Sequence, residues 1–122
     1  MKNRVFILLM VVALSLFSAC EKDKDAFVTF GANYHVIDCI SYVTIYLDGK
    51  NIGQLQGYTD TIKSCGQPEN ITKSIVPGKH SYKIEIRPDM GVGCKKDIEG
   101  TFKVKAGECH KVFIDYFKID WE

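Results

Sequence analysis

Short runs of alternating apolar and polar residues, each closed by Gly, Pro, Asn or Asp, recur at regular spacing from residue 27 onward. An alternating run suits a strand with one face in a core, because successive side chains point to opposite sides of the sheet. Several such runs separated by turn residues are typical of a β-sandwich or barrel. The sequence therefore predicts an all-β fold, a single small antiparallel β-sandwich of about six or seven strands in residues 27–122.

The run at residues 40–47 is the strongest predicted strand. Its apolar residues share one face, while the other face carries Tyr42 and Tyr46. Asp48-Gly49 follows, and glycine accepts the positive φ that a tight hairpin turn requires. We expect a return strand directly after this turn.

Two stretches lack alternation and are predicted to be loops, residues 57–70 and residues 88–96. A loop as long as the first is normally functional or tied down in a compact domain. Each loop contains a cysteine, Cys65 in the first and Cys94 in the second. Disulfides at these cysteines would supply the restraint.

The N-terminal residues have the composition of a secretory signal segment. Lys2 and Arg4 precede an apolar run at residues 5–17, and small residues follow it. This run is shorter than the about 20 residues that cross a bilayer, so a retained anchor helix is the weaker interpretation. We interpret residues 1–19 as a cleaved signal segment and residues 20–26 as a charged tether.

The end of this segment, Phe17-Ser18-Ala19-Cys20, resembles a bacterial lipobox, with Phe17 where that pattern usually has leucine. The resemblance implies that Cys20 is lipidated, becomes the mature N-terminus and anchors the chain at the outer membrane. Two or three acyl chains hold a protein on a membrane stably. A secreted protein would leave Cys20 as an unpaired thiol.

The charged residues 21–25 are similar to the short acidic and lysine-containing signals of surface-exposed lipoproteins in Bacteroidetes-type bacteria. That resemblance implies display on the cell surface. The alternative is a polar spacer between the lipid and the folded domain.

Without Cys20 the chain has four cysteines, and an even number in an exported domain of this size predicts two disulfides. If the strands alternate in direction, Cys39, Cys65 and Cys94 fall at one end of the sandwich and Cys109 at the other. Bridged Cα atoms lie within about 7 Å of each other. We therefore expect a Cys65–Cys94 bond, which leaves Cys39–Cys109 as the remainder, although four cysteines allow other pairings.

A zinc site is the alternative use of two of these cysteines. His35, Cys39, Cys109 and His110 include ligand types that zinc accepts. Adjacent residues in a strand point to opposite faces, however, so Cys109 and His110 are poorly placed to share one ion. We expect neither a metal nor another cofactor.

Motifs for catalysis are missing from the sequence. It has no C-x-x-C, no glycine-rich phosphate loop, no H-E-x-x-H and no G-x-S-x-G. The acidic residues Asp97 and Glu99 share one strand face, as expected for a solvated surface. Without Lys2 and Arg4 the chain has 14 basic and 15 acidic residues and no basic patch, which argues against nucleic acid as a partner. We expect no enzyme activity.

Aromatic residues provide the candidate binding surface. The last strand is predicted to run from Cys109 to about Ile119. Aromatic residues lie at outward positions of this strand and of the run at residues 40–47, if Val112 and Ile114 point inward, and Trp121 follows with the same parity. If these two strands are neighbours, their aromatic side chains form one exposed patch suited to sugar rings or to a protein. The patch would contain Tyr42, Tyr46, Phe113, Phe117 and Trp121. Two alternatives are that residues 27–30 cover it as a second core, or that Phe113 points into the main core.

Three segments, residues 43–50, 76–80 and 102–108, resemble landmarks of PEGA-like domains, which are small β-sandwiches of bacterial surface proteins. The resemblance spans residues 40–117 and implies a fold without catalytic residues. The loop at residues 57–70 and the cysteines depart from that pattern.

Together these features predict a lipid-anchored, disulfide-bonded module at the outer membrane that binds a carbohydrate or an envelope protein without catalysis. Two other functions remain open. The chain could be a structural subunit of a cell-envelope assembly, or an inhibitor-like module that presents the loop at residues 57–70 or 88–96.

Overall fold

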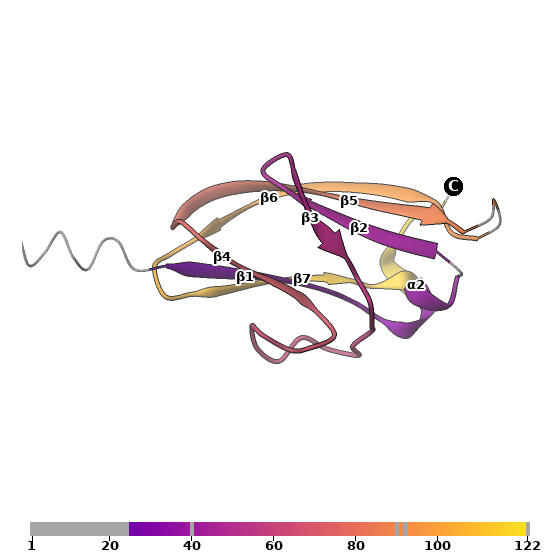
Figure 1. Cartoon of the computed structure of the whole chain (residues 1–122), viewed down its shortest axis with the longest axis horizontal. Helices are drawn as coiled ribbons and strands as arrows, with labels where there is room; N and C mark the ends of the chain where they lie inside the picture. The colour runs from indigo at the N-terminus through magenta and orange to yellow at the C-terminus, as the bar shows by residue number, and fades with distance from the viewer. Residues whose placement is uncertain (1–24, 40, 90, 92, 122) are drawn as a thin grey trace, which may run out of the picture.

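The computed structural model describes residues 25–121 except residues 40, 90 and 92, so Cys20 and the predicted signal segment lie outside the described part. Two stacked sheets form the molecule, which confirms the all-β sandwich (Figure 1). The strands are β1 (Ala26–Ala32), β2 (Ser41–Leu47), β3 (Lys50–Gln54), β4 (Ile71–Ile75), β5 (Gly78–Pro88), β6 (Lys96–Val104) and β7 (Cys109–Ile114). Two short helices that the sequence did not predict complete it, α2 (Tyr34–Asp38) and η1 (Tyr116–Lys118).

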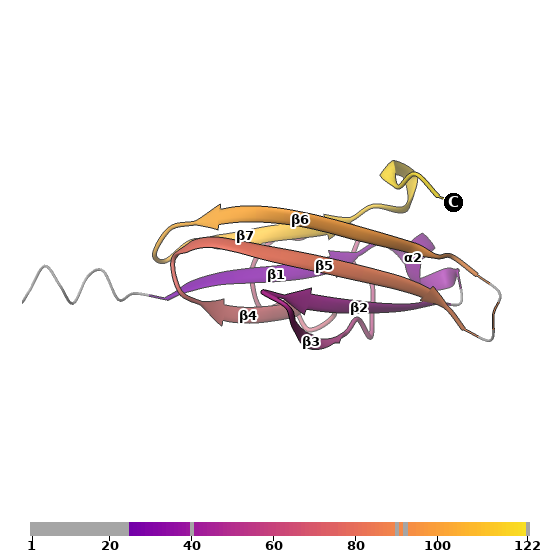
Figure 2. The same ribbon diagram turned by 90° about the horizontal axis from the view of Figure 1, so that it is seen from above.

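One sheet has the strand order β4-β1-β7 and the other β3-β2-β5-β6, as the two views show (Figures 1 and 2). Every pair is antiparallel except β1–β7, which is parallel. The predicted antiparallel arrangement therefore holds for every one of these pairs except β1–β7. Because β1 and β7 run the same way, α2 and η1 leave the sheet at the same end. We call this the distal end, and the end where β1 begins the proximal end.

The core lies between the two sheets and follows the alternation seen in the sequence. Val28 and Phe30 of β1 are wholly buried and pack in the main core instead of covering an outer aromatic patch. In β7 the alternation places Val112 and Ile114 inside and Phe113 outside, as predicted. Each fully buried apolar side chain contributes about 1.5–3 kcal/mol, so this pattern fixes the register of the strands.

The last strand ends earlier than the sequence predicted. β7 stops at Ile114, and Asp115 then accepts a hydrogen bond from the backbone N–H of Phe117 at 3.1 Å. This cap begins η1, so Tyr116 and Phe117 lie in a helical turn instead of a strand. A carboxylate that bonds an N–H two residues ahead favours a turn over a continuing strand.

The segment at residues 55–70 folds back over the outer face of the three-stranded sheet. Thr29 points outward from β1, yet its side chain is wholly buried beneath this segment. Thr72 Oγ1 donates to Thr29 Oγ1 at 2.9 Å and accepts a hydrogen bond from Gly66 N at 3.0 Å. The predicted loop therefore covers a sheet instead of projecting into solvent.

Two disulfides are present, but the predicted pairing is wrong. The bonds are Cys39–Cys94 and Cys65–Cys109, with Cα separations of 5.4 and 5.9 Å. Cys39 and Cys94 lie at the distal end, as expected. The folded-back loop, however, carries Cys65 to the proximal end, where Cys109 begins β7.

These bonds also separate the residues of the alternative zinc set. Cys39 and Cys109 bond to different partners at opposite ends of the sandwich. Within the described residues no group of three or more His, Cys, Asp or Glu side chains is arranged to hold a metal ion. No helix in the same part of the chain is long and apolar enough to span a membrane.

Candidate functional site

Six aromatic side chains gather at the distal end of the sandwich, where α2, η1 and the segment after β3 meet. We call them the distal aromatic cluster: Tyr34, His35, Tyr58, Tyr116, Phe117 and Trp121. They come from three separate parts of the sequence. The fold alone brings them together.

The outer part of the cluster is a chain of four rings. Tyr58 and Tyr34 have ring centroids 5.1 Å apart, Tyr34 and His35 are 6.0 Å apart, and His35 and Phe117 are 4.9 Å apart. All three contacts are edge-to-face, the geometry that aromatic quadrupoles favour. The rings therefore support one another as a surface.

The inner part of the cluster rests on Tyr116. Its ring centroid is 5.7 Å from that of His35 and 5.3 Å from that of Trp121. The indole N–H of Trp121 donates to the backbone oxygen of Tyr116 at 3.1 Å. The half-buried Trp121 thus ties the C-terminal residues to the cluster.

Asn33 joins the two segments that carry most of the cluster. It lies between β1 and α2, and its side chain is aimed at the segment after β7 instead of capping its own helix. Its Nδ2 donates to Asp115 Oδ1 at 3.0 Å, and its Oδ1 accepts from Tyr116 N at 3.2 Å. Because Asn33 is buried, these bonds form in a medium of low polarity, where they constrain geometry strongly.

Further contacts hold α2 and Tyr58 in place. Val36 of α2 is wholly buried in the core, and its backbone oxygen accepts from Ser41 Oγ at 3.0 Å. The Cys39–Cys94 disulfide joins the end of α2 to the loop between β5 and β6. The residue after Tyr58, Thr59, is buried and donates its N–H to Ala32 O at 2.8 Å. Each carrier segment is therefore fixed to the sandwich.

The cluster is accessible to a ligand. Tyr34, Tyr58 and Phe117 are 46, 50 and 72% exposed, respectively. Tyr and His side chains add polar atoms at the rims of their rings. The arrangement can stack against a flat apolar surface and hydrogen-bond to groups around its edge.

The structure divides the predicted aromatic surface. Tyr42 and Tyr46 lie on the outer face of the four-stranded sheet, whereas Phe113 lies on the outer face of the three-stranded sheet. The prediction of one patch is therefore wrong, because β2 and β7 are in different sheets whose outer faces point in opposite directions. Only Phe117 and Trp121 of the predicted set belong to the distal aromatic cluster.

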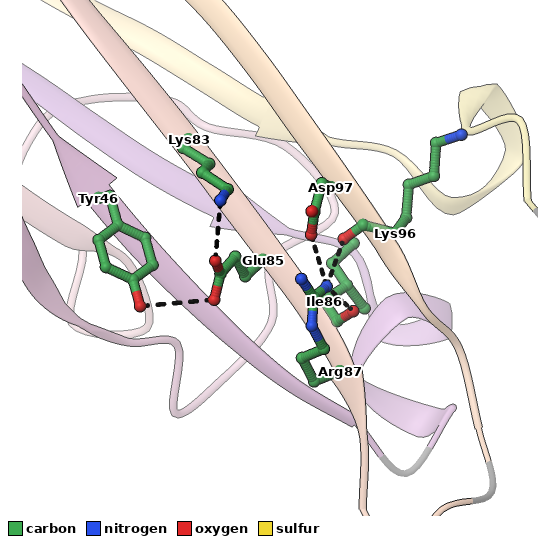
Figure 3. Close-up of polar contacts among 7 residues, drawn as sticks. All are labelled: Tyr46, Lys83, Glu85, Ile86, Arg87, Lys96 and Asp97. Atoms are coloured by element: carbon green, nitrogen blue, oxygen red, sulfur yellow. Dashed lines mark hydrogen bonds and ion pairs between the residues drawn. The ribbon is translucent and has the colours of Figure 1, made fainter. Parts of the chain in front are cut away.

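Tyr46 has a polar neighbour instead of an aromatic one. Its hydroxyl donates to Glu85 Oε2 at 3.4 Å, and Glu85 also pairs with Lys83 at 3.0 Å (Figure 3). Tyr42 is half exposed near the start of β2. These two tyrosines belong to a polar outer face.

The sequence contained a signal for the missed residues. β1, β3 and β7 all end at the distal end, because the strands alternate in direction along the chain. Aromatic residues in the segments that follow these three strands are thus brought together, which applies to Tyr34, Tyr58 and Tyr116. Counting strand directions would have found them.

A second group of rings lies toward the proximal end. His80 Nδ1 is 2.6 Å from Asp48 Oδ2, and His80 Nε2 is 2.6 Å from the backbone oxygen of Val76. A carbonyl only accepts hydrogen bonds, so both ring nitrogens carry hydrogen when both bonds form. The hydrogen bond to Asp48, with that to Val76, accordingly raises the pKa of His80 above its ordinary value of 6.5. Neither nitrogen is left to take a proton from a substrate.

The Phe102 ring contacts a second histidine as well as His80. Phe102 stacks on His110 with a centroid distance of 4.4 Å and on His80 with one of 5.5 Å. Burial lowers the pKa of His110, while the nearby Glu108 opposes that shift. The two histidines thus have opposite pKa shifts although both stack on the same ring.

Comparisons with family models, with curated proteins and with solved structures found no match for this chain.

Proposed function

We propose that this chain is a lipid-anchored, non-catalytic binding module of the outer membrane that recognises carbohydrate through the distal aromatic cluster. The observation that carries the proposal is the chain of rings from Tyr58 to Phe117, fixed to the sandwich through Asn33. A pyranose has an apolar C–H face and a rim of hydroxyl groups. Aromatic faces with polar atoms at their edges complement both features.

The size of the exposed aromatic surface favours a small ligand. An aromatic side chain has about 200 Å² of surface, so the exposed parts of Tyr34, Tyr58 and Phe117 together offer about 300 Å². A specific protein interface buries about 800 Å² on each partner. The cluster is therefore large enough for one or two sugar rings and too small for a stable protein interface.

The proposed location rests on the resemblance of residues 17–20 to a lipobox, and the fold is consistent with it. The four other cysteines form two disulfides, the usual state in an oxidising compartment. β1 begins at Ala26, soon after Cys20, and its seven residues extend about 23 Å toward the distal end. A lipid at Cys20 would thus leave the cluster at the end farther from the membrane.

Trp121, the only tryptophan in the chain, allows a direct test of binding. Its ring lies against Tyr116 in the cluster, so ligand binding there should change its fluorescence. We would titrate the full chain with a panel of glycans in detergent and record Trp121 emission. At least one glycan should give a saturable change, and Phe117→Ala should weaken that binding about tenfold.

Phe113→Ala is the matched control. It removes an exposed phenylalanine of β7 that is not one of the rings of the cluster, and it should leave glycan affinity unchanged. A panel without any saturable response would refute carbohydrate binding. Loss of affinity in both variants alike would place the ligand elsewhere. Mass spectrometry of the mature chain tests the anchor separately, because an N-terminus other than acylated Cys20 would refute it.

A further inference from the structure

β6 forms one edge of the four-stranded sheet and, in the described part of the chain, pairs only with β5 (Figure 2). The backbone N–H and oxygen of Ser81 in β5 point toward β2. The N–H donates to Oδ1 of Asp48, the residue after β2, at 2.9 Å, and the oxygen accepts from Asp48 N at 2.8 Å. Thr101 lies opposite Ser81, so its own backbone groups point away from β5. The same holds for Glu99 and Lys103, two residues to either side. This edge therefore offers an unpaired row of donors and acceptors.

The side chains of the same positions carry an ordered set of charges. Asp97, Glu99, Thr101, Lys103 and Lys105 are all exposed and alternate with the inward residues of β6. The two acidic residues precede Thr101, and the two basic residues follow it at equal distances. The pattern is therefore its own complement when the strand direction is reversed.

The charges nearest the centre have no ion-pair partner in the described residues. Lys103 lies opposite Lys79 of β5, a like charge. Glu99 lies opposite Lys83, whose ammonium pairs with Glu85 at 3.0 Å (Figure 3). Neither Glu99 nor Lys103 forms an ion pair of its own in this part of the chain. A partner beyond the edge can place an opposite charge beside each of these two residues.

We propose that a second copy of this chain pairs with the first through β6, antiparallel and with Thr101 on the two-fold axis. Glu99 then lies opposite Lys103 of the second copy, and Asp97 lies opposite Lys105. On the inward side, Ile98 lies opposite Val104. The two four-stranded sheets become one continuous sheet, with opposite charges paired across the junction.

This register pairs more opposite charges across the junction than the neighbouring registers do. If the second copy is shifted by two residues along β6, only one kind of ion pair forms across the junction instead of two. One of the two possible shifts also places Lys95 opposite Lys105. A parallel, in-register pairing places like charges opposite each other, which is destabilising. Charged residues on an edge strand usually prevent sheets from joining. Here they favour one arrangement over the others.

Beside the acidic half of β6, the edge borders a groove instead of another strand of its own sheet. A groove of about 450 Å³ separates β6 from β7 along the acidic half of β6. Its walls include the apolar side chains of Ile98, Val112 and Ile119. A strand added to β6 would lie along the side of this groove that β6 forms.

Thr101→Cys tests the arrangement directly. Directly opposite residues in a hydrogen-bonded antiparallel pair have Cα atoms about 5.5 Å apart, within the range of a disulfide. The full chain carrying this substitution, expressed in cells and mildly oxidised, should form a disulfide-linked dimer on non-reducing gels. Ser81→Cys is the matched control, since Ser81 is exposed on the same face and one strand farther from the axis. We expect the Thr101→Cys dimer to form about tenfold faster.

Charge exchange tests the register. In the Thr101→Cys background, Glu99→Lys or Lys103→Glu should each slow dimer formation about tenfold, and the two together should restore it. Equal crosslinking of Thr101→Cys and Ser81→Cys would show random collision and overturn the proposal. Crosslinking of Thr101→Cys to another protein, or failure of the exchanged pair to restore the dimer, would also overturn it. Sedimentation of the same charge variants without the added cysteine gives a second measure of self-association.

Discussion

The side chain of Asn33 donates a hydrogen bond to Asp115 Oδ1 over 3.0 Å, joining residues 82 positions apart in the sequence. Asn33 follows β1 and Asp115 follows β7, so this bond links the ends of the two parallel strands. Together with the Tyr116 N–H bond to Asn33, it sets the distance between α2 and η1. The geometry of the distal aromatic cluster depends on it.

Asn33→Ala should therefore affect both stability and the cluster. Removing the buried amide leaves Asp115 and the N–H of Tyr116 without this partner, which should cost about 1–3 kcal/mol of unfolding free energy. The emission of Trp121 should also shift, because it packs on Tyr116. Urea unfolding and the native emission spectrum measure the two effects. Asn51→Ala, which removes only an exposed bond to Gly53, is the control and should change neither by much.

Removing the Cys65–Cys109 bond should release the loop that covers β1. Closing 44 residues of chain contributes about 4 kcal/mol in the chain-entropy model, and Cys39–Cys94, which closes 55, contributes about the same. Replacing both cysteines of either disulfide by alanine should thus lower the unfolding free energy by a similar amount. Amide hydrogen exchange separates them, because only the variant without Cys65 and Cys109 should lose protection around Thr29. Equal loss of protection in both would contradict this account.

Gly31 should not tolerate a side chain, because the folded-back loop lies directly on it. A Cβ at this position would lie 2.6 Å from Asn70 Oδ1 and 3.0 Å from Thr59 Cγ2. We expect Gly31→Ala to cost about 1–3 kcal/mol in urea unfolding. The main obstacle is the Asn70 side chain, so Asn70→Ala in the same chain should recover part of that loss. Additive effects of the two substitutions would argue against this contact.

Stability should have a maximum near pH 6.5, the ordinary pKa of histidine. The raised pKa of His80 gives stability that is full below pH 6.5 and is lost as the pH rises through the folded-state value. The lowered pKa of His110 has the opposite effect: stability is full above pH 6.5 and is lost as the pH falls through the folded-state value.

Urea unfolding at pH values from about 5 to 8.5 would reveal both limbs of this profile. His80→Gln should flatten the alkaline limb and leave the acid limb. His110→Gln should do the reverse. A wild-type profile without a maximum, or one that both substitutions alter in the same way, would contradict the assignment of the two limbs.

The alternation of the sequence determined most of the fold but not the partners of each strand. Inward and outward positions in residues 109–114 follow from periodicity alone, and Phe113 lies outside as predicted. That β7 joins β1, in the sheet that does not contain β2, depends on contacts between distant residues. The predicted aromatic patch failed at this step.

The path of residues 55–70 was the other unpredictable feature. These residues lack periodicity, so the sequence gives no direction for them, and their course is set by contact with the outer face of β1. Two residues of β1 allow this contact. Thr29 forms a hydrogen bond with Thr72, and Gly31, which has no side chain, leaves space for Asn70. Cys65 is consequently carried to Cys109 instead of remaining near Cys94.

The parallel pairing of β1 and β7 has a mechanical consequence. β1 begins at the proximal end and its last residues adjoin the distal aromatic cluster, with β4 bonded along one side and β7 along the other. A force pulling the start of β1 away from the distal end acts along the strand, at right angles to its hydrogen bonds to β4 and across the slanted bonds to β7. Such a load shears both ladders at once instead of opening them one bond at a time. A domain built this way resists unfolding when it is pulled from the start of β1 while its distal end is held.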